Sequence, residues 1–215
     1  DLHSFPTRRS SDLKKAHTQK KNVYIPAGTY ELNRELNVSA ENMIISGAGI
    51  WYTNIHFTSA EKGGGGFIGV GSGDSGECKN IEFCHMYINS NLRSRYFMDG
   101  GYNAIAKSCF IHDIWEEHFS TGVWMNTNFG IGYSDGVKII NCRMRNNHAD
   151  GINFNQGTSD ATVYNCSIRN NGDDGLAMWA SAFSNVKNLT NNVFCYNTIE
   201  LNWRSGAIAV YGGTG

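Results

Sequence analysis

Two short segments of the chain place aspartates after the same asparagine pair and directly before a glycine. They read NNHADGINF at 146–154 and NNGDDGLAM at 170–178, so Asp150 and Asp174 lie 24 residues apart. Asp173 adds a third carboxylate to the second segment. Clustered carboxylates are the groups that acid–base hydrolysis of a glycosidic bond requires, and they are also ligands for a hard cation such as Ca²⁺.

Hydrolysis of a glycosidic bond needs an acid that protonates the leaving oxygen and a carboxylate that activates water. If the two segments lie on successive coils of stacked strands, Asp150 sits about 4.8 Å from Asp174, and the pair could hold that water. Asp173 could then stay protonated as the acid, because two acidic neighbours disfavour a further negative charge. With water between base and sugar, we expect the larger, inverting carboxylate separation of roughly 6.5–9.5 Å. The spacing leaves open which of Asp173 and Asp174 is the acid.

A purely structural role and a metal-binding role also remain open for the aspartates. Asp-Gly is a common turn dipeptide, so the carboxylates could serve only the backbone. A structural Ca²⁺ could also bind there, although no C-x-x-C pair or His–Cys cluster with metal-ligand spacing occurs elsewhere. We therefore expect no cofactor and no other metal.

The segments flanking the aspartates contain residues suited to binding sugars. WEEHFST at 115–121 precedes them, and NWRS at 202–205 follows. Candidates for stacking on sugar rings are Trp115, Trp179 and Trp203, and candidates for hydrogen bonds to hydroxyls are Glu117, His118, His148 and Arg204. Filling the core or shielding the surface of the coils is an equal alternative for Trp115 and Trp203, and it is the role that we expect for Trp124.

The elements that carry these residues are short alternating apolar runs separated by Asn, Gly, Asp and Ser, which indicates strands joined by turns. A glycine followed by apolar residues recurs at Gly122, Gly151, Gly175 and Gly206, with spacings of 29, 24 and 31 residues. Such a period, with about three strands in each repeat, predicts an all-β, right-handed parallel β-helix. A β-sandwich would lack a fixed period. Alignment on the glycines gives one corner ladder: Thr121, Asp150, Asp174 and Ser205.

Four of the six cysteines, namely Cys84, Cys109, Cys142 and Cys166, begin similar short runs. If those runs stack, the four side chains form one inward ladder. A free cysteine packs well as a small apolar residue. We therefore expect buried, reduced thiols rather than disulfides.

Composition restricts the classes of partner. A length of 215 residues suffices for one domain, and a net charge of −1 gives no basic surface for nucleic acid. No apolar run approaches the roughly 18 residues that span a bilayer. Residues 3–13 (HSFPTRRSSDL) match a reading frame of a common sequencing adapter. We expect 1–13 to be an artefact of assembly and 14–215 to be a fragment of a β-helix domain truncated at both ends.

Several motifs together resemble glycoside hydrolase family 87, the α-1,3-glucanases and mycodextranases. These motifs are GAGIWYTNI at 47–55, WEEHFSTGVWM at 115–125, NNHADGINF at 146–154, NNGDDGLAMW at 170–179 and AIAVYGG at 207–213. The resemblance runs from about Lys21 to the C-terminus. It implies a right-handed parallel β-helix that hydrolyses α-1,3-glucosidic bonds with inversion.

The resemblance also implies roles for individual residues. Asp173 would be the general acid, while Asp150 and Asp174 would activate water. It further implies a secreted enzyme, although a signal peptide is not observable here. We expect a monomer that acts on internal bonds of α-1,3-glucan or nigeran. One alternative is a non-catalytic β-helix that binds polysaccharide or builds a surface fibre. Another is pectate-lyase-like or polygalacturonase-like action on acidic polymers, which would need more basic residues than Arg145 and Arg204.

Overall fold

The structure is a computed structural model that describes residues 9–69, 77–96, 99–125, 133–155, 157–180 and 189–212. Its elements are α1 (Arg9–Thr18), β1 (Val23–Ile25), β2 (Gly28–Leu32), β3 (Leu36–Asn37), β4 (Glu41–Gly47), β5 (Thr53–Phe57), β6 (Phe67–Gly69), β7 (Cys78–Ser90), β8 (Gly100–Ala104), β9 (Ala106–Lys107), β10 (Phe110–Glu117), β11 (Thr121–Met125), β12 (Lys138–Ile140), β13 (Arg143–Arg145), β14 (Ile152–Asn155), β15 (Thr162–Tyr164), β16 (Ser167–Arg169), β17 (Leu176–Trp179), β18 (Val193–Cys195), β19 (Thr198–Glu200) and β20 (Ile208–Tyr211).

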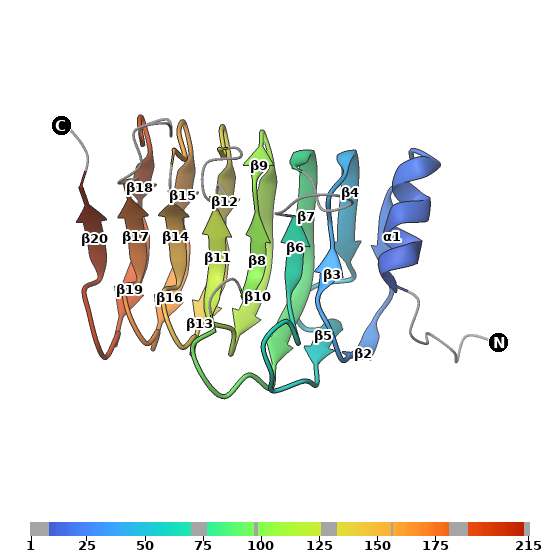
Figure 1. Ribbon diagram of the computed structural model, residues 1–215, viewed down its shortest axis with the longest axis horizontal. Coiled ribbons are helices and arrows are strands. Elements are labelled where there is room, and N and C mark those ends of the chain that lie inside the picture. The colour runs from blue at the N-terminus through green and yellow to red at the C-terminus, as the bar shows by residue number, and fades with distance from the viewer. Residues whose placement is uncertain are drawn as a thin grey trace.

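The strands form two sheets, and every named strand pair in the described residues is parallel. One sheet has seven strands in the order β20-β17-β14-β11-β8-β6-β3. The other has thirteen strands and follows the path β1-β4-β7-β10-β12-β15-β18, with shorter strands beside it. Figure 1 shows the strands side by side along the long axis, with α1 at one end and β20 at the other. This arrangement confirms the predicted parallel β-helix and excludes the sandwich.

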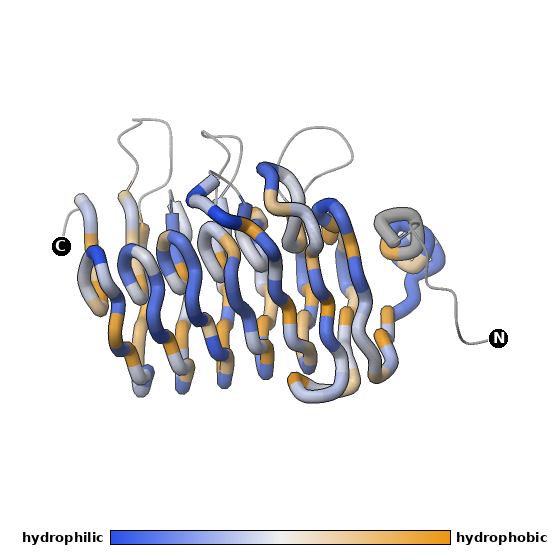
Figure 2. Tube along the Cα trace, turned by 90° about the horizontal axis from the view of Figure 1, so that it is seen from below, coloured by the Kyte–Doolittle hydropathy of each residue, from blue (hydrophilic) through white to orange (hydrophobic). Residues whose placement is uncertain are grey.

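The core lies inside the coils and consists of stacked apolar side chains. Strand register places five of them in one ladder: Ile45, Phe83, Ile111, Ile139 and Val163. Each is at most 1% exposed. Because strand side chains alternate between faces, matching register repeats the same inward positions in every coil. Figure 2 shows hydrophobic segments recurring along the coils in this way.

The asparagine pair before each aspartate forms the turn between sheets. Asn146 and Asn170 both have φ of 56°, a left-handed conformation that asparagine tolerates. Asn147 and Asn171 are buried, and the Asn147 backbone N–H donates to Asn171 Oδ1 at 3.2 Å. Thus the first asparagine turns the chain, and the second ties one coil to the next.

The predicted corner ladder is correct for two steps and wrong for the third. Ile152 pairs with Leu176, so Asp150 aligns with Asp174 at the predicted offset of 24. Leu176 pairs with Ile208, which aligns Asp174 with Gly206 instead of Ser205. The reason is one extra residue between β19 and β20. Ser167 pairs with Thr198 in the strands before this turn, whereas Leu176 pairs with Ile208 after it, so the offset between the two coils grows by one residue.

All six cysteines are free, and five are buried. The expectation of buried thiols holds for those five, but the single ladder of four is wrong. Cys142 and Cys166 share one rung, and the Cys142 backbone N–H donates to Cys166 Sγ at 3.4 Å. The register offset is 28 residues between β7 and β10 and also between β10 and β13, so Cys84 pairs with His112 and Cys142 aligns with Ile114.

The helix α1 packs at one end of the coils. Its Leu13 is 7% exposed and belongs to the buried core. Within the residues that the structure describes, no helix is long and apolar enough to cross a membrane.

Candidate active site

Three carboxylates converge at the corner that precedes the seven-stranded sheet. Asp150 lies two residues before β14, while Asp173 and Asp174 lie just before β17. Because β14 and β17 are in register, one oxygen from each aspartate falls within 4.8 Å of the others. The repeat in the sequence therefore produces a single cluster of acidic groups.

Asp174 is the most firmly held of the three. Its Oδ1 accepts hydrogen bonds from Ser205 Oγ at 2.6 Å and from the Gly206 backbone N–H at 3.0 Å. Its Oδ2 accepts one from the Tyr211 hydroxyl at 2.9 Å. The side chain is 2% exposed. These three hydrogen bonds fix the orientation of the Asp174 carboxylate at the corner.

Asp150 is also buried, with 5% of its surface exposed, but it accepts fewer hydrogen bonds than Asp174. Its Oδ1 accepts from the Asp174 backbone N–H at 3.1 Å, and its Oδ2 accepts from Asn153 Nδ2 at 2.7 Å. Desolvation by burial raises the pKa of Asp150, and the charges of Asp173 and Asp174 add to that rise. The two hydrogen bonds oppose the rise without cancelling it.

Asp173 is the most open of the three and contacts a distant segment. Its side chain is 25% exposed, and its Oδ2 accepts a hydrogen bond from Arg95 Nη1 in a short ion pair. Arg95 belongs to the segment that follows β7. The Leu92 carbonyl of that segment lies 2.9 Å from His148 Nε2. The segment is thereby fastened over the aspartate corner.

The three carboxylates open into a groove of about 730 Å³. The lining residues are Arg95, Tyr96, Ser120, Thr121, Trp124, Ala149, Asp150, Asn153, Asn155, Asp173, Asp174, Trp179 and Tyr211. Its floor is the outward face of the seven-stranded sheet. One outward row aligns Trp124 with Asn153, and the next aligns Asn155 with Trp179 and Tyr211.

Aromatic side chains line the groove beside the carboxylates. Trp179 is 46% exposed and lies 4.6 Å from Tyr211 between ring centroids. Trp124 also lines the groove, so it lies on the outer surface of the coil and does not fill the core. The physical reason is strand alternation: Val123 and Met125 point inward, which turns Trp124 outward.

Trp115 and Glu117, both predicted to bind substrate, lie outside the groove lining. Trp115 packs on the outer face of the thirteen-stranded sheet, against Trp51 at 5.0 Å and Tyr87 at 5.2 Å between ring centroids. Arg145 lies over the Trp115 ring at 5.6 Å. Glu117 accepts a hydrogen bond from the Tyr87 hydroxyl at 3.0 Å. These residues form an aromatic and charged cluster on a different face.

The other predicted binding residues surround the groove without lining it. His118 is exposed at a left-handed turn position, with φ of 65°. His148 holds the Leu92 carbonyl. Trp203 is 67% exposed, and its backbone N–H donates to the Asn171 carbonyl at 3.2 Å. Arg204 is exposed in the same turn.

Several of the lining residues were not predicted from the sequence. Asn155 and Tyr211 could have been found by extending the coil register along the strand that contains Trp179. Arg95 and Tyr96 could not, because they lie in a segment outside the repeat. Arg95 is also 78 residues from Asp173 in sequence.

The aspartate oxygens are also the atoms that could hold a cation at this corner. Both oxygens of Asp150 and of Asp174 already accept hydrogen bonds within the protein. The spacing between nearest oxygens, within 4.8 Å, is tighter than the roughly 6.5–9.5 Å expected between an inverting acid and base. In-register stacking explains this closeness, since it sets neighbouring coils about 4.8 Å apart.

Basic residues are scarce in the groove. Arg95 is the one lysine or arginine among the described lining residues, and it is paired with Asp173. Arg145 packs over Trp115, and Arg204 lies outside the lining. The groove therefore lacks the positive charge that uronate polymers require.

The chain is similar to α-1,3-glucanase catalytic domains over nearly its whole length. The family model described as alpha-1,3-glucanase catalytic domain D2 matches residues 8–215. Among solved structures, the Agl-KA catalytic domain shares 42% identity with a TM-score of 0.86, covering 95% of this chain and 36% of that one. No curated protein matches the chain in sequence.

Two further structures extend this similarity. The catalytic unit of the thermostable GH87 α-1,3-glucanase from Streptomyces thermodiastaticus strain HF3-3 is 25% identical, with a TM-score of 0.77, over 99% of this chain and 36% of that one. A GH87 α-1,3-glucanase catalytic domain in complex with nigerose is 24% identical, with a TM-score of 0.76, over 98% and 36% respectively, and supports the fold. The chain thus spans about 36% of the length of these solved domains. The match over residues 8–215 shows that the chain belongs to the α-1,3-glucanase catalytic domain family, glycoside hydrolase family 87.

Proposed function

We propose that this protein is an inverting, endo-acting glycoside hydrolase that cleaves α-1,3-glucosidic bonds. The observation that carries the proposal is the convergence of Asp150, Asp173 and Asp174 in one open groove, in a chain of the α-1,3-glucanase family. A β-helix that served only as a scaffold would have no need to gather three carboxylates at one solvent-open corner. Their mutual repulsion is a local cost that catalysis explains.

The partners of each aspartate suggest its role. Asp174 is held in place by three hydrogen-bond donors, so it serves as a base that positions and deprotonates the attacking water with Asp150. Asp173 is the most open of the three and serves as the acid that protonates the leaving oxygen. Arg95 must move away from Asp173 before that proton transfer. That movement would free Asp173 Oδ2 to approach the leaving oxygen.

The proposed substrate is a neutral α-1,3-glucan or nigeran. Trp124, Trp179 and Tyr211 offer aromatic faces for glucose rings, while Asn153 and Asn155 offer amides for hydroxyl groups. Solved family relatives carry nigerose and tetrasaccharides, which is consistent with such a groove. A groove open to solvent accommodates internal bonds of a long chain, which favours endo action.

The chemistry we propose needs no cofactor, because two carboxylates and an acid complete the proton transfers. We also propose that the protein is secreted and acts as a monomer, since a polysaccharide of this kind is met outside the cell. Chelation by EDTA should leave the rate of glucan hydrolysis unchanged at temperatures well below unfolding. Loss of activity under those conditions would show that a cation acts at the carboxylates.

Product stereochemistry tests the proposal directly. The protein is incubated with α-1,3-glucan, nigeran and dextran, and the first products are followed by ¹H NMR of their anomeric protons. We expect new reducing ends from α-1,3-linked substrates in the β configuration, which then mutarotate. Initial release of the α anomer would refute inversion, and release from dextran alone would refute the substrate assignment.

A further inference from the structure

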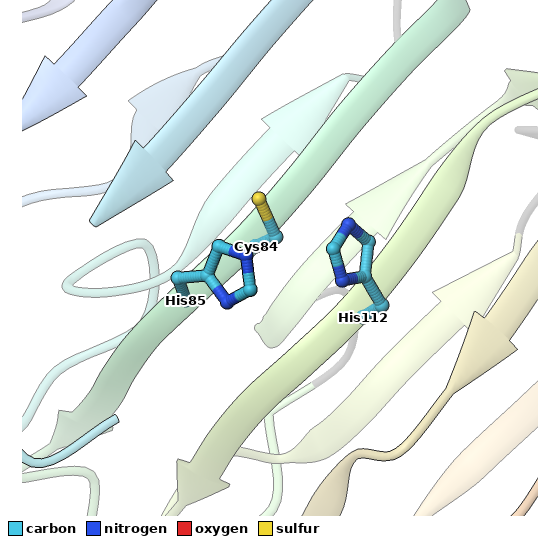
Figure 3. A group of neighbouring side chains, drawn as sticks. All are labelled: Cys84, His85 and His112. Atoms are coloured by element: carbon cyan, nitrogen blue, oxygen red, sulfur yellow. The ribbon is translucent and has the colours of Figure 1, made fainter. Parts of the chain in front are cut away.

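A second group of potential ligand side chains lies on the thirteen-stranded sheet, away from the catalytic groove. Cys84 and His85 come from β7, and His112 comes from the neighbouring strand β10 (Figure 3). One ligand atom from each falls within 4.8 Å of the others. None of the three lines the groove. They form a compact set of one thiol and two imidazoles.

Strand register and one unusual backbone conformation bring the three side chains together. Cys84 and His112 are direct partners in the parallel pair of β7 and β10. Adjacent strand residues normally point to opposite faces, but His85 has φ of 59° and leaves the strand conformation. This lets His85 gather on the same side as Cys84. The same left-handed position holds Asn141 and Asn165 in later coils, with φ of 56° and 53°.

Two carboxylates complete the surroundings of His112. Asp113 Oδ2 lies 2.8 Å from His112 Nδ1, so a proton on Nδ1 would be donated to Asp113. Glu82 Oε1 lies 3.2 Å from His112 Nε2 and 3.7 Å from Cys84 Sγ. The Phe110 ring stacks on the His112 ring with centroids 4.1 Å apart. The imidazole is therefore oriented with Nε2 toward the thiol and Glu82.

We propose that Cys84, His85 and His112, with Glu82 as fourth ligand, form a structural Zn²⁺ site. Thiolate and imidazole ligands select borderline-soft divalent ions, and Zn²⁺ takes such sets in tetrahedral geometry. Asp113 would not bind the ion. It would accept a hydrogen bond from His112 Nδ1 and so orient the His112 ring with Nε2 toward the ion. Four protein ligands leave no open position for substrate, so the ion has a structural role.

The expected effect of the ion is to fasten two successive coils together. Glu82, Cys84 and His85 lie on β7, while His112 lies on β10, so one bound ion bridges both strands. Zn²⁺ binds the thiolate form of cysteine, so the Cys84 thiol must lose its proton when the ion binds. Binding must displace that proton, and affinity for the metal should therefore rise with pH.

Metal titration of the protein tests this site. Chelated and dialysed protein is titrated with Co²⁺ and with Zn²⁺, using absorbance and metal analysis after gel filtration. We expect one equivalent of Co²⁺ with a thiolate-to-metal charge-transfer band and tetrahedral visible bands, both removed by one equivalent of Zn²⁺. Co²⁺ spectra without the thiolate band, or no retained metal, would overturn the proposal.

Matched variants separate this site from adventitious binding. Cys84→Ser should abolish the thiolate band, and His85→Asn should weaken Co²⁺ binding at least tenfold. His85→Asn should also fold, because asparagine occupies the equivalent position in two later coils. Cys195→Ser alters a less buried thiol on β18 and should change neither result. Retention of the thiolate band in Cys84→Ser, or its loss in Cys195→Ser alone, would refute the assignment.

Thermal unfolding gives a second readout. Zn²⁺ should raise the Tm of the wild type and of Cys195→Ser equally, and at the same Zn²⁺ concentration it should raise the Tm of His85→Asn less. An equal rise in all three proteins would indicate non-specific binding and would contradict the proposal. Rates of glucan hydrolysis below the unfolding temperature should not depend on Zn²⁺.

Discussion

At the scale of single residues, the repeat gives two aspartates that differ in their surroundings. Asp150 and Asp174 occupy equivalent corner positions, yet Asp174 has three donors from the following coil and Asp150 has two from its own neighbourhood. Burial therefore raises the pKa of Asp150. The sequence predicted that the carboxylates gather, but not these differences, because the donors to Asp174 come from Ser205, Gly206 and Tyr211, which lie outside the two repeated segments.

The pH dependence of activity should respond to Asn153. Its amide stabilises ionised Asp150, so Asn153→Ala should raise the pKa of Asp150 further. A base must be ionised to act, and the acidic limb of kcat/KM should therefore move to higher pH, by roughly half to one pH unit for about 1 kcal/mol of hydrogen bonding. Asn155→Ala, in the same groove, is the control. An acidic limb that stays fixed or moves to lower pH would contradict the assignment of Asp150 as base.

The stability of the fold should increase when Asp150 loses its charge. A carboxyl whose pKa is raised by folding stabilises the fold only in acid, and that contribution is lost as pH rises above its unfolded pKa. Asp150→Asn should remove this loss. Asn153 Oδ1, which has no hydrogen-bond partner among the described residues, could accept a hydrogen bond from the new amide after a flip of the Asn153 side chain. We expect Tm at pH 7 to rise by about 2–4 °C while hydrolysis is lost. A lower Tm in calorimetry would show that the charge of Asp150 does not destabilise the fold.

At the scale of the elements, the turns determine where the site forms. Asn147 joins its own coil to the next, and its Nδ2 donates to Glu116 Oε2 at 2.9 Å. Glu116 is 1% exposed and lies between Gly101 and Gly122, and its Oε1 has no hydrogen-bond partner within the described part of the chain. A β-carbon added at either glycine would lie 2.6 Å from Glu116. The glycine frame was visible in the sequence, but the buried acid beneath it was not, because glutamate is ordinarily read as exposed.

Glu116 should make stability depend on pH. Burial raises its pKa well above 4.5, so the folded state holds the proton more tightly than the unfolded state. Stability should be greatest in acid and should decline above about pH 5, by up to about 1.4 kcal/mol per pH unit until the folded-state pKa is reached. Glu116→Gln keeps an acceptor for Asn147 and should lack this decline.

Urea unfolding of wild type and Glu116→Gln between pH 4.5 and 7.5 measures the difference. The variant should become progressively more stable relative to wild type as pH rises. Glu31→Gln, on the exposed side of β2, should show no such trend. A constant difference between Glu116→Gln and wild type across this range would show that Glu116 is not protonated in the fold.

At the scale of the whole molecule, the period of the sequence was sufficient to predict a parallel β-helix. The period did not show which face of the coil forms the groove. Trp115 and Trp124 both point outward, one on the thirteen-stranded sheet and the other into the groove. A two-residue alternation separates inside from outside, but it does not distinguish one outer face from another. The segment carrying Arg95 also covers the corner through contacts that no repeat encodes.

Stability should be distributed unevenly along the coils. Ile139 is 0% exposed in the central ladder, whereas Ile208 on β20 is 54% exposed. Ile139→Ala should cost about 2–5 kcal/mol of unfolding free energy, since it removes buried methyl groups and leaves a cavity. Ile208→Ala should cost less than about 1 kcal/mol. Equal losses in chemical denaturation would contradict the described packing.

The proposed function depends above all on the three aspartates performing glucan hydrolysis, and the rate of Asp173→Asn tests this role most directly. Initial release of reducing ends from α-1,3-glucan is compared for wild type, Asp173→Asn and the control Asp160→Asn, whose carboxylate accepts from Asn191 in a distant turn. Glucan binding is measured for each by co-sedimentation. Loss of the acid should lower the rate by about 10²–10⁴-fold with binding retained, while the control should match wild type. An Asp173→Asn rate within twofold of wild type would show that Asp173 is not the acid.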